Sequence, residues 1–233
     1  MTSLAGGLDV SVSAGKDLDG ALQIALSAIA HTYDLARLSW NDDVVVTRRT
    51  PQQKFGPALV TPPPGAFLQA TPQGEKALLE SAKEAVGNAS KIADLFAGCG
   101  TFSLPLAMQA QVHAVEGSAA MMQALDHGWR HGANMKRVTT ETRDLFRRPL
   151  MVDELAAFDA VVIDPPRAGA EAQVAQLAQS NVARIAFMSC NPITFSRDAK
   201  VLVAAGWSLD WVQVVDQFRW SPHVELAAQF TRA

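Results

Sequence analysis

The feature that most constrains the fold of this chain is a regular alternation of two kinds of segment after residue 65. Short apolar runs rich in β-branched residues, typical of buried strands, alternate with segments whose apolar residues recur at helical spacing. The predicted strands are KIADLF, QVHAVE, a run near 137–140, FDAVVID, ARIAFMS, WSLDWVQVVD and VELAAQFT. The predicted helices lie near 72–86, from 101, from 118, from 171 and near 192–204. This order predicts an α/β fold with a doubly wound, mostly parallel sheet and a C-terminal antiparallel hairpin.

The region before this alternation is predicted to be a small α+β segment. LDVSVS, ARLSW and DVVVTRR have strand character, with a turn at Asn41-Asp42, and DLDGALQIALSAIAHTYDL has helical spacing. The stretch TPPPG, residues 61–65, follows, and its three prolines remove backbone donors and fix φ, which favours an extended connector. We therefore predict two regions: residues 1–60, too short to form a domain alone, and a main domain over residues 61–233.

The overall charge and the cysteines set broad limits. The chain has 20 Lys and Arg against 23 Asp and Glu, so contact with a nucleic acid would need a local basic patch. Its two cysteines, Cys99 and Cys190, match no spacing of zinc or iron–sulfur ligands and predict free thiols in a reducing compartment, with no metal. No apolar run approaches the ~20 residues that span a bilayer. Because the start also lacks a secretory signal pattern, we expect a cytoplasmic protein without membrane contact.

Gly98 and Gly100 lie in the predicted turn between the first strand of the alternation and its helix, within DLFAGCGTFSLPLA. Glycines in such a turn let the backbone pass close to a ligand, and the following helix offers unpaired N–H groups. The next strand ends at Glu116, where a carboxylate can accept hydrogen bonds from both hydroxyls of a ribose. A dinucleotide site would have a third glycine where Ser103 stands, so S-adenosylmethionine is favoured over NAD. The alternative is an ordinary tight turn beside a solvated carboxylate.

Three more predicted strands are followed by residues whose side chains can bind a ligand or take part in a reaction. Asp144 follows the third strand, and it is predicted either to bind the amino group of an adenine or to cap a helix. VVIDPPRAG ends a strand at Asp164, and its prolines hold the next turn rigid. Methyltransferases that act on amino nitrogens of bases place an aromatic residue after such a turn, where this chain has Arg167. Cys190 ends the next strand as either a nucleophile or core packing, and the following helix N-terminus is expected to lower the pKa of its thiol.

Four stretches, GAFLQATPQG, DLFAGCGTFSLPLA, VVIDPPRAG and SCNPITFSRD, with a closing SPHVELAAQF, resemble one family. It is the family of S-adenosylmethionine-dependent RNA uridine C5-methyltransferases, which make 5-methyluridine in ribosomal and transfer RNA. The resemblance runs from about Gly65 to the C-terminus and implies a class I methyltransferase fold, which is Rossmann-like. It also implies that Cys190 is the nucleophile, that Glu225 is the general base, and that Asp164 serves both the catalytic and the cofactor sites. The remaining residues expected at the cofactor site are Gln69, Phe96, Gly98, Gly100, Thr101, Glu116 and Asp144.

The chemistry of this family explains why these residue types are needed. Uracil C5 is a poor nucleophile, but addition of a thiolate to C6 gives C5 carbanion character, a form of covalent catalysis. The proton that remains on C5 after methylation must then be removed by a positioned base. A hydrogen-bond donor near O4 or O2 would stabilise the enolate, and Arg167 and Ser189 are both candidates. A uridine inside folded RNA must also be extruded to reach such a pocket.

Several of these residues have a structural alternative. Glu225 alternates with apolar residues, as an exposed strand residue does, and His223 either orients it or caps a turn, the latter being favoured. Cys99 is expected to pack beneath the glycine loop, and Gln69 can be a turn residue before the helix. The cluster RDLFRRPL holds three arginines that either touch RNA phosphates or face solvent: Arg143, Arg147 and Arg148.

Three other functions compete with RNA uridine methylation. A non-catalytic cofactor- or RNA-binding module of the same fold would not need Cys190, Glu225 and Asp164 together. A C5-cytosine methyltransferase would carry a Pro-Cys dipeptide at its nucleophile, whereas the order here is Cys-Asn-Pro. A nicotinamide oxidoreductase is disfavoured by the missing third glycine.

The chain also departs from the family pattern at its N-terminal end. Members usually carry an N-terminal OB-like RNA-binding domain, and some hold an iron–sulfur cluster on N-terminal cysteines. This sequence shows neither pattern, so we expect no cluster, and its first sixty residues resemble the end of the insert that normally precedes the catalytic domain. Two explanations stay open: the chain is part of a longer protein, or it recognises RNA with fewer elements. We expect an RNA substrate, with ribosomal RNA favoured over transfer RNA.

Overall fold

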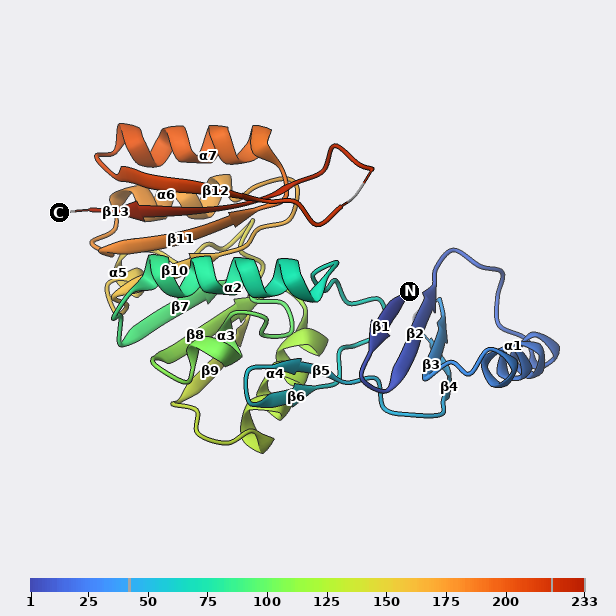
Figure 1. Ribbon diagram of the computed structural model, residues 1–233. Helices are drawn as coiled ribbons and strands as arrows, with labels where there is room; N and C mark the ends of the chain where they lie inside the picture. The colour runs from blue at the N-terminus through green and yellow to red at the C-terminus, as the bar shows by residue number, and fades with distance from the viewer. Residues whose placement is uncertain (42, 219, 233) are drawn as a thin grey trace.

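Seven strands form the main sheet of the computed structural model, in the order β12-β13-β11-β10-β7-β8-β9 (Figure 1). The structure describes residues 1–41, 43–218 and 220–232. Neighbouring strands from β9 to β11 are parallel, whereas β13 is antiparallel to both β11 and β12. The predicted doubly wound, mostly parallel sheet with a C-terminal antiparallel hairpin is therefore confirmed. The strand bounds are β7 (Lys91–Leu95), β8 (Gln111–Glu116), β9 (Val138–Thr142), β10 (Ala160–Ile163), β11 (Arg184–Ser189), β12 (Ser208–Val215) and β13 (Glu225–Thr231).

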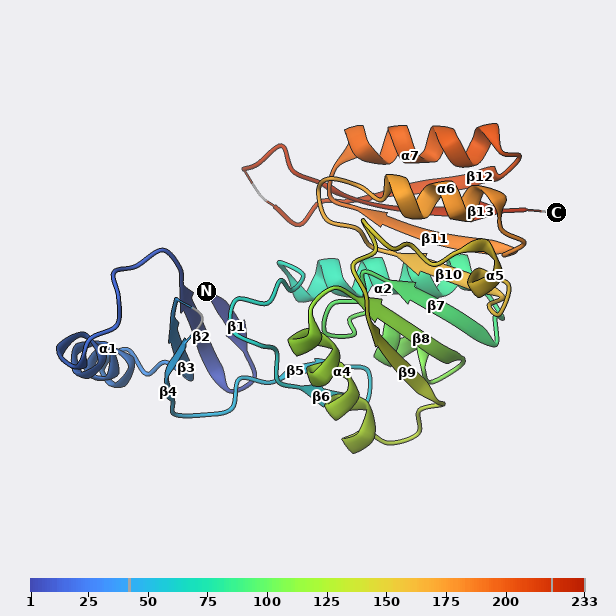
Figure 2. The ribbon, with the colours of Figure 1, turned by 180° about the vertical axis from the view of Figure 1, so that it is seen from behind.

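Helices cover both faces of this sheet, as Figures 1 and 2 show from opposite sides. Because successive strand residues point to opposite faces, Ile92 and Ala93 of β7 belong to two separate apolar clusters. No helix in the described ranges combines the length and the apolar character that crossing a membrane requires. One face packs against α2 (Pro72–Val86), α3 (Ser103–Leu106) and α4 (Ala119–His131), and the other against α5 (Val152–Leu155), α6 (Glu171–Gln179) and α7 (Pro192–Ala204).

Local sequence explains where the longest of these helices begins and ends. Thr71 precedes α2 in an extended conformation, and its hydroxyl accepts a hydrogen bond from the Gly74 N–H at 3.0 Å. Pro72 occupies the first helical position, where the N–H that it lacks would have no partner. Gly87 ends the helix with a positive φ of 57°, which a residue with a β-carbon rarely adopts. These signals are why the predicted bounds agree with the structure.

The N-terminal residues form a small sheet of their own, in the order β1-β2-β3-β4. The α1 helix (Gly20–Thr32) connects the parallel strands β2 and β3 and covers an apolar cluster that includes Leu26 and Leu38. The small N-terminal α+β segment is thus confirmed, although the predicted turn at Asn41-Asp42 includes Asp42, which lies outside the described residues. The strands are β1 (Thr2–Leu4), β2 (Gly7–Val12), β3 (Arg37–Trp40) and β4 (Asp43–Thr47).

A hairpin that the sequence analysis missed joins the two regions. Its strands, β5 (Gln53–Phe55) and β6 (Ala58–Val60), are three residues each. The hairpin packs on the main domain, because Phe55 is buried in the same apolar cluster as α2 and α4. At its turn Gly56 lies so close to α3 that a β-carbon would come within 3.1 Å of the Pro105 Cα. The division after residue 60 stays a prediction, and we propose that the hairpin belongs with the main domain.

The carboxyl ends of the parallel strands face the N-terminal sheet (Figure 1). The Arg37 guanidinium holds the connector between them: it donates to the Pro62 carbonyl at 2.8 Å and pairs with the Asp9 carboxylate at 2.6 Å. Both partners of this ion pair are buried, so the contact of Arg37 with Pro62 requires that the ion pair stay intact. The connector then leads directly to the residues that line the site described next.

Candidate active site

A cavity of about 700 Å³ opens at the carboxyl ends of β7, β8, β10 and β11. Its size lies within the range of roughly 300–1,000 Å³ for small-molecule sites. Gly100 is the predicted site residue that does not line it, because Gly100 packs instead against Leu104 and Leu125. The predicted residues on the wall are Gln69, Phe96, Gly98, Thr101, Glu116, Asp144, Asp164, Cys190 and Glu225. The sequence analysis missed further wall residues: Phe67, Leu68, Met121 and Phe146.

The glycine loop holds Glu116 at one side of this cavity. Phe96 and Gly98 both have positive φ values, of 62° and 54°, which turn the backbone after β7 back toward β8. The Gly98 N–H donates to Glu116 Oε2 at 3.2 Å, and the Ser118 N–H donates to Oε1 at 3.0 Å. Each carboxylate oxygen keeps a further lone pair for a ligand. Glu116 is therefore held by backbone donors and is not the freely solvated carboxylate of the alternative interpretation.

Asp144 and its neighbours form the adjoining wall. The Asp144 carboxylate accepts a hydrogen bond from the Phe146 N–H at 3.0 Å and closes a turn. Because the next helix, α5, begins only at Val152, the helix-cap alternative for Asp144 is wrong. The ring of Phe146 packs against that of Phe96 with centroids 5.4 Å apart. The wall thus combines two aromatic rings with a carboxylate.

Cys190 and Glu225 lie side by side at the opposite wall. Ser189 of β11 pairs with Leu226 of β13, so the next residue of one strand and the preceding residue of the other emerge together on one side of the sheet. Glu225 is 3% exposed, whereas Cys190 is half-buried. Because β13 runs antiparallel to β11, its first residue lies next to the residue that follows β11, and one ligand can contact both Cys190 and Glu225.

Three hydrogen bonds hold the loop that carries Cys190 in place. Asn191 begins α7, and its side-chain oxygen accepts from the Ile193 N–H at 3.0 Å. Its amide nitrogen donates to the Arg167 carbonyl at 3.0 Å, which joins the cysteine loop to the loop after Asp164. The Ser189 hydroxyl donates to the Asn191 carbonyl at 3.1 Å. These contacts fix the two loops relative to one another.

A second link between the same motifs comes from α7. Asp198 is buried, and its carboxylate accepts from the Ala170 N–H at 2.9 Å, at the start of α6. Arg197 donates to the same carboxylate at 2.8 Å and also to the Ala168 carbonyl at 3.2 Å. The last residues of SCNPITFSRD therefore support the loop of VVIDPPRAG.

The ionisable groups of this wall favour their neutral forms. Burial, reinforced by the charges of Glu225 and Asp94, raises the pKa of Asp164 to about 8. Burial also raises the pKa of Glu225, opposed by a hydrogen bond from Gln217. The pKa of the Cys190 thiol is raised by burial and by the nearby Glu225 and Asp164 carboxylates.

The expectation that the α7 N-terminus lowers the pKa of the Cys190 thiol is therefore wrong. Pro192 at the first helical position has no N–H to offer, and the Ile193 N–H already donates to the Asn191 side chain. Burial and two carboxylates outweigh what remains of the helix dipole. The resting protein holds Cys190 as a thiol.

Asp94 is the last residue but one of β7 and does not line the cavity. It is fully buried, its Oδ2 accepts a hydrogen bond from the Ser103 hydroxyl, and its Oδ1 has no hydrogen-bond partner among the described residues. Burial raises the pKa of Asp94 from 3.8 to about 7. The carboxyl is thus protonated in the folded protein over a range of pH in which it would be ionised in the unfolded chain.

Replacement of Asp94 by Asn should flatten the pH dependence of stability. The favourable contribution of the raised pKa is fully present below about pH 4 and is lost as the pH rises through about 7, because the folded state binds the extra proton in that window. Between about pH 4 and about pH 7, the unfolding free energy of the wild type should therefore fall by roughly 4 kcal/mol more than that of Asp94→Asn. Urea unfolding at a series of pH values measures this difference. Asp17→Asn, which alters an exposed carboxylate, is the control, and an unchanged slope in Asp94→Asn would contradict the assignment.

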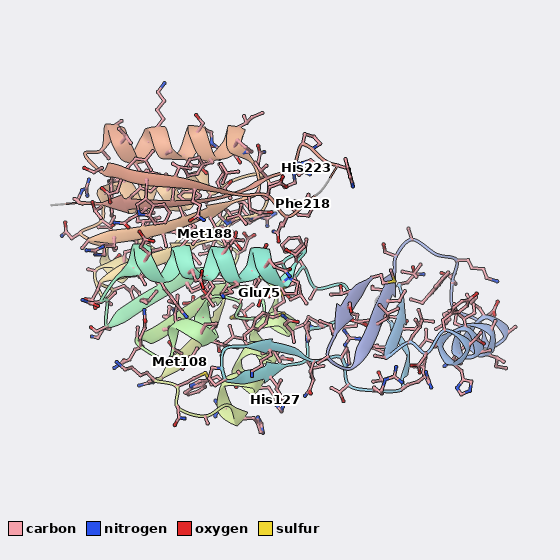
Figure 3. All side chains as sticks on the ribbon, in the orientation of Figure 1. Glu75, Met108, His127, Met188, Phe218 and His223 are labelled. Atoms are coloured by element: carbon pink, nitrogen blue, oxygen red, sulfur yellow. The ribbon has the colours of Figure 1, made fainter. Side chains whose placement is uncertain are left out.

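Arg167 stands at the mouth of the cavity. Its guanidinium donates to His223 Nδ1 at 3.0 Å, because arginine has no hydrogen-bond acceptor. Figure 3 labels His223 in the loop between β12 and β13. The His223 N–H donates to the Ser221 hydroxyl at 3.2 Å, so His223 shapes this turn, as favoured from the sequence.

The remaining predicted residues separate into buried and exposed groups. Cys99 is 1% exposed in the core beneath the glycine loop, and burial raises the pKa of its thiol to about 12. Arg143 pairs with Glu141 and Glu154, each at 2.9 Å. That leaves Arg147 and Arg148 exposed as candidates for contact with phosphate. No three metal-ligand side chains are grouped within the part of the chain that the structure describes.

The order and directions of the strands are those of the class I methyltransferase fold. The chain superimposes on the crystal structure of the Pyrococcus abyssi tRNA (uracil-54, C5)-methyltransferase in complex with S-adenosyl-L-homocysteine with a TM-score of 0.74. The alignment covers 96% of this chain and 56% of that one, at 24% identity, a level at which the likeness establishes the fold. The predicted class I fold is confirmed.

Sequence comparison then identifies the family: the model of the tRNA (uracil-5-)-methyltransferase family matches residues 59–233, and the chain belongs to it. An uncharacterized RNA methyltransferase of Mesorhizobium japonicum is 47% identical over 98% of this chain and 55% of the relative. A 23S rRNA (uracil(1939)-C(5))-methyltransferase of Pseudomonas entomophila is 38% identical over 72% of this chain and 38% of the relative. The chain spans about half the length of the first of these relatives and less of the second. The predicted family is confirmed.

Proposed function

We propose that this chain transfers a methyl group from S-adenosylmethionine to C5 of a uridine in RNA through a covalent adduct with Cys190. The observation that carries the proposal is the placement of Cys190 beside Glu225 at the end of paired strands, on the wall of one cavity with the glycine loop. We propose ribosomal RNA as the substrate class. The 23S rRNA (uracil(1939)-C(5))-methyltransferase at 38% identity supports this choice over transfer RNA.

The residues that line the cavity have the chemistry needed to bind S-adenosylmethionine. Glu116, held by two backbone N–H groups, is suited to bind ribose hydroxyls, and Asp144 is suited to accept from the adenine amino group. The rings of Phe96 and Phe146, which pack against each other, offer apolar surface on which the adenine can lie. When bound, the cofactor would supply an electrophilic methyl group next to the wall that carries Cys190.

Cys190 would begin the reaction at the uracil ring. Its thiol must lose a proton, and the sulfur then forms a bond to C6 while the C5–C6 double-bond electrons move toward C5 and O4. Because the resting thiol is neutral, its proton must pass to solvent as the substrate binds, so that Glu225 is still a carboxylate when the C5 proton has to be removed. C5 is then nucleophilic enough to take a methyl group.

Glu225 would complete the reaction. After methylation C5 carries both the new methyl group and its original hydrogen. Glu225 removes that proton, the electron pair re-forms the C5–C6 double bond, and the C6–sulfur bond breaks to release Cys190. Burial raises the pKa of Glu225, which makes it a stronger base than an exposed carboxylate.

The geometry favours Arg167 over Ser189 as the group that stabilises the enolate. The Ser189 hydroxyl donates within the loop, and its side chain is 3% exposed. Arg167 lines the cavity, and its charge is close enough to oppose the rise in pKa that burial causes at Glu225 and at Cys190. A cation at this position stabilises negative charge on a uracil oxygen.

The direct test is nucleoside mass spectrometry of RNA incubated with the chain and methyl-labelled S-adenosylmethionine. Bulk ribosomal and transfer RNA from a strain that lacks the gene provides unmethylated substrate. We expect labelled 5-methyluridine in the ribosomal fraction with the wild type and none with Cys190→Ala. Labelled 5-methylcytidine in its place, or cofactor binding without any methylated nucleoside, would contradict the proposal.

A further inference from the structure

The loop between β12 and β13 is the most exposed aromatic element at the mouth of the cavity. Phe218 and His223, both labelled in Figure 3, pack edge to face with ring centroids 6.4 Å apart. The Ser221 N–H donates to the Phe218 carbonyl at 3.1 Å, which closes a turn. Through the hydrogen bond of His223 to Arg167, this turn is tied to the wall that holds Cys190.

Trp220 lies within this turn, and none of the described residues covers its side chain. Its side chain is fully exposed, at 101% of the reference value, so the indole gains nothing from burial. Its φ of 68° is in the left-handed region, which a bulky side chain disfavours and which Gly or Asn adopts at lower cost. A large aromatic residue that is both strained and solvent-exposed is typical of a site that contacts another molecule.

The chemistry of the substrate indicates what that use is. A uridine that enters the cavity leaves the base stack, and its neighbours in the strand then lose a stacking partner. Aromatic side chains replace such partners in proteins that bind single-stranded RNA. Stacking also suits a chain with a net charge of −3, because it adds affinity without phosphate contacts.

We propose that Trp220 stacks on the base of a nucleotide adjacent to the target uridine. This inference rests on the proposed function, because it assumes that RNA enters the cavity beside Cys190. The loop fixes the indole at the rim through Phe218 and His223, so the neighbour of the extruded uridine meets it outside the cavity. Trp220 thereby selects for RNA that is unpaired next to the target, without reading its sequence.

The test compares Trp220→Ala, Trp220→Phe and a control, Tyr33→Ala, for binding to a fluorescein-labelled RNA with one uridine between adenosines. Tyr33 is an exposed aromatic residue at the end of α1, and Figure 1 shows this helix beside the N-terminal sheet, away from the main sheet. We expect Trp220→Ala to raise the dissociation constant roughly 5- to 100-fold, the effect of removing one stacked base. Trp220→Phe should restore most of the affinity, and Tyr33→Ala should leave it unchanged.

A second RNA, with abasic sites beside the uridine, tests the contact itself. If the indole stacks on a neighbouring base, the abasic RNA binds wild type as weakly as the intact RNA binds Trp220→Ala, and combining the two changes adds little. Equal affinity of wild type and Trp220→Ala for the intact RNA, including no binding by either, overturns the proposal and points to a protein partner for the indole.

The readout separates this inference from the proposed function. A wild type that makes 5-methyluridine while Trp220→Ala shows the same RNA affinity retains the function and rejects the stacking role. A wild type that makes no methylated nucleoside rejects the function, and the affinity ratio still decides the role of Trp220. Melting temperature and S-adenosylmethionine affinity, measured for each variant, exclude misfolding as the cause of a loss.

Discussion

Cys190→Ala should lower kcat for RNA methylation by about 10⁴-fold or more, the range seen when a catalytic nucleophile is removed. Without the sulfur no bond forms to C6, and C5 keeps the low reactivity of an intact uracil ring. The dissociation constant for S-adenosylmethionine should stay within about threefold of the wild-type value. Of the residues suited to the adenosine, Glu116 ends β8 and Asp144 lies in the loop after β9, and both are held by backbone N–H groups that the substitution leaves in place. Single-turnover methylation and calorimetric titration of the cofactor measure the two effects.

Cys99→Ala is the matched control for this variant. It removes a thiol from the core beneath the glycine loop, where the sulfur does not line the cavity. Its kcat should stay close to the wild-type value, with a modest loss of stability from the lost packing. Loss of cofactor binding in Cys190→Ala, or equal loss of turnover in the two variants, would contradict the role assigned to Cys190.

The sequence predicted which residues gather at the site because parallel strands all end at the same edge. Glu116, Asp164 and Cys190 each follow an apolar run with strand character, and strands in βαβ order must place those ends together. The order of the sheet in the structure agrees, with β8, β7, β10 and β11 as neighbours. Assignment of the strands and helices from the local sequence pattern was therefore enough to predict which of these residues lie together at the carboxyl edge of the sheet.

Contacts made over long distances in sequence were not predictable in the same way. The link from Asn191 to the Arg167 carbonyl and the cap that Asp198 gives to α6 join residues on separate loops. The hairpin of β5 and β6 was missed because two strands of three residues give no clear alternation. Its stability comes from Phe55, which is buried against the main domain.

Charge at the site was the least predictable property. The sequence places Cys190 before a helix N-terminus, which by itself lowers the pKa of a thiol. The structure adds burial together with Asp164 and Glu225, which come from two other strands, and these reverse the direction. A pKa sums the effects of all neighbours in space, and a local motif specifies only the neighbours along the chain.

Glu225→Gln should convert turnover into accumulation of a covalent protein–RNA adduct. The amide cannot accept the C5 proton, so the C6–sulfur bond formed by Cys190 cannot be expelled after methylation. Gln has nearly the same shape, and pairing of residue 225 with Val215 keeps the backbone of β13 in place. We expect a species of lower mobility on denaturing gels that contains labelled methyl group, RNA and protein, while kcat falls by about 10²- to 10⁴-fold.

Two comparisons determine whether the adduct has this origin. The double variant Cys190→Ala with Glu225→Gln should form no such species, because the sulfur that bonds to C6 is gone. Omission of S-adenosylmethionine should also prevent the methyl-labelled adduct, since the trapped state lies after methylation. A Glu225→Gln variant that binds RNA and cofactor yet turns over at the wild-type rate, or that stops without any adduct, would show that another group removes the proton. In that case Asp164, whose pKa is raised to about 8 on the same wall, would be the next base to substitute.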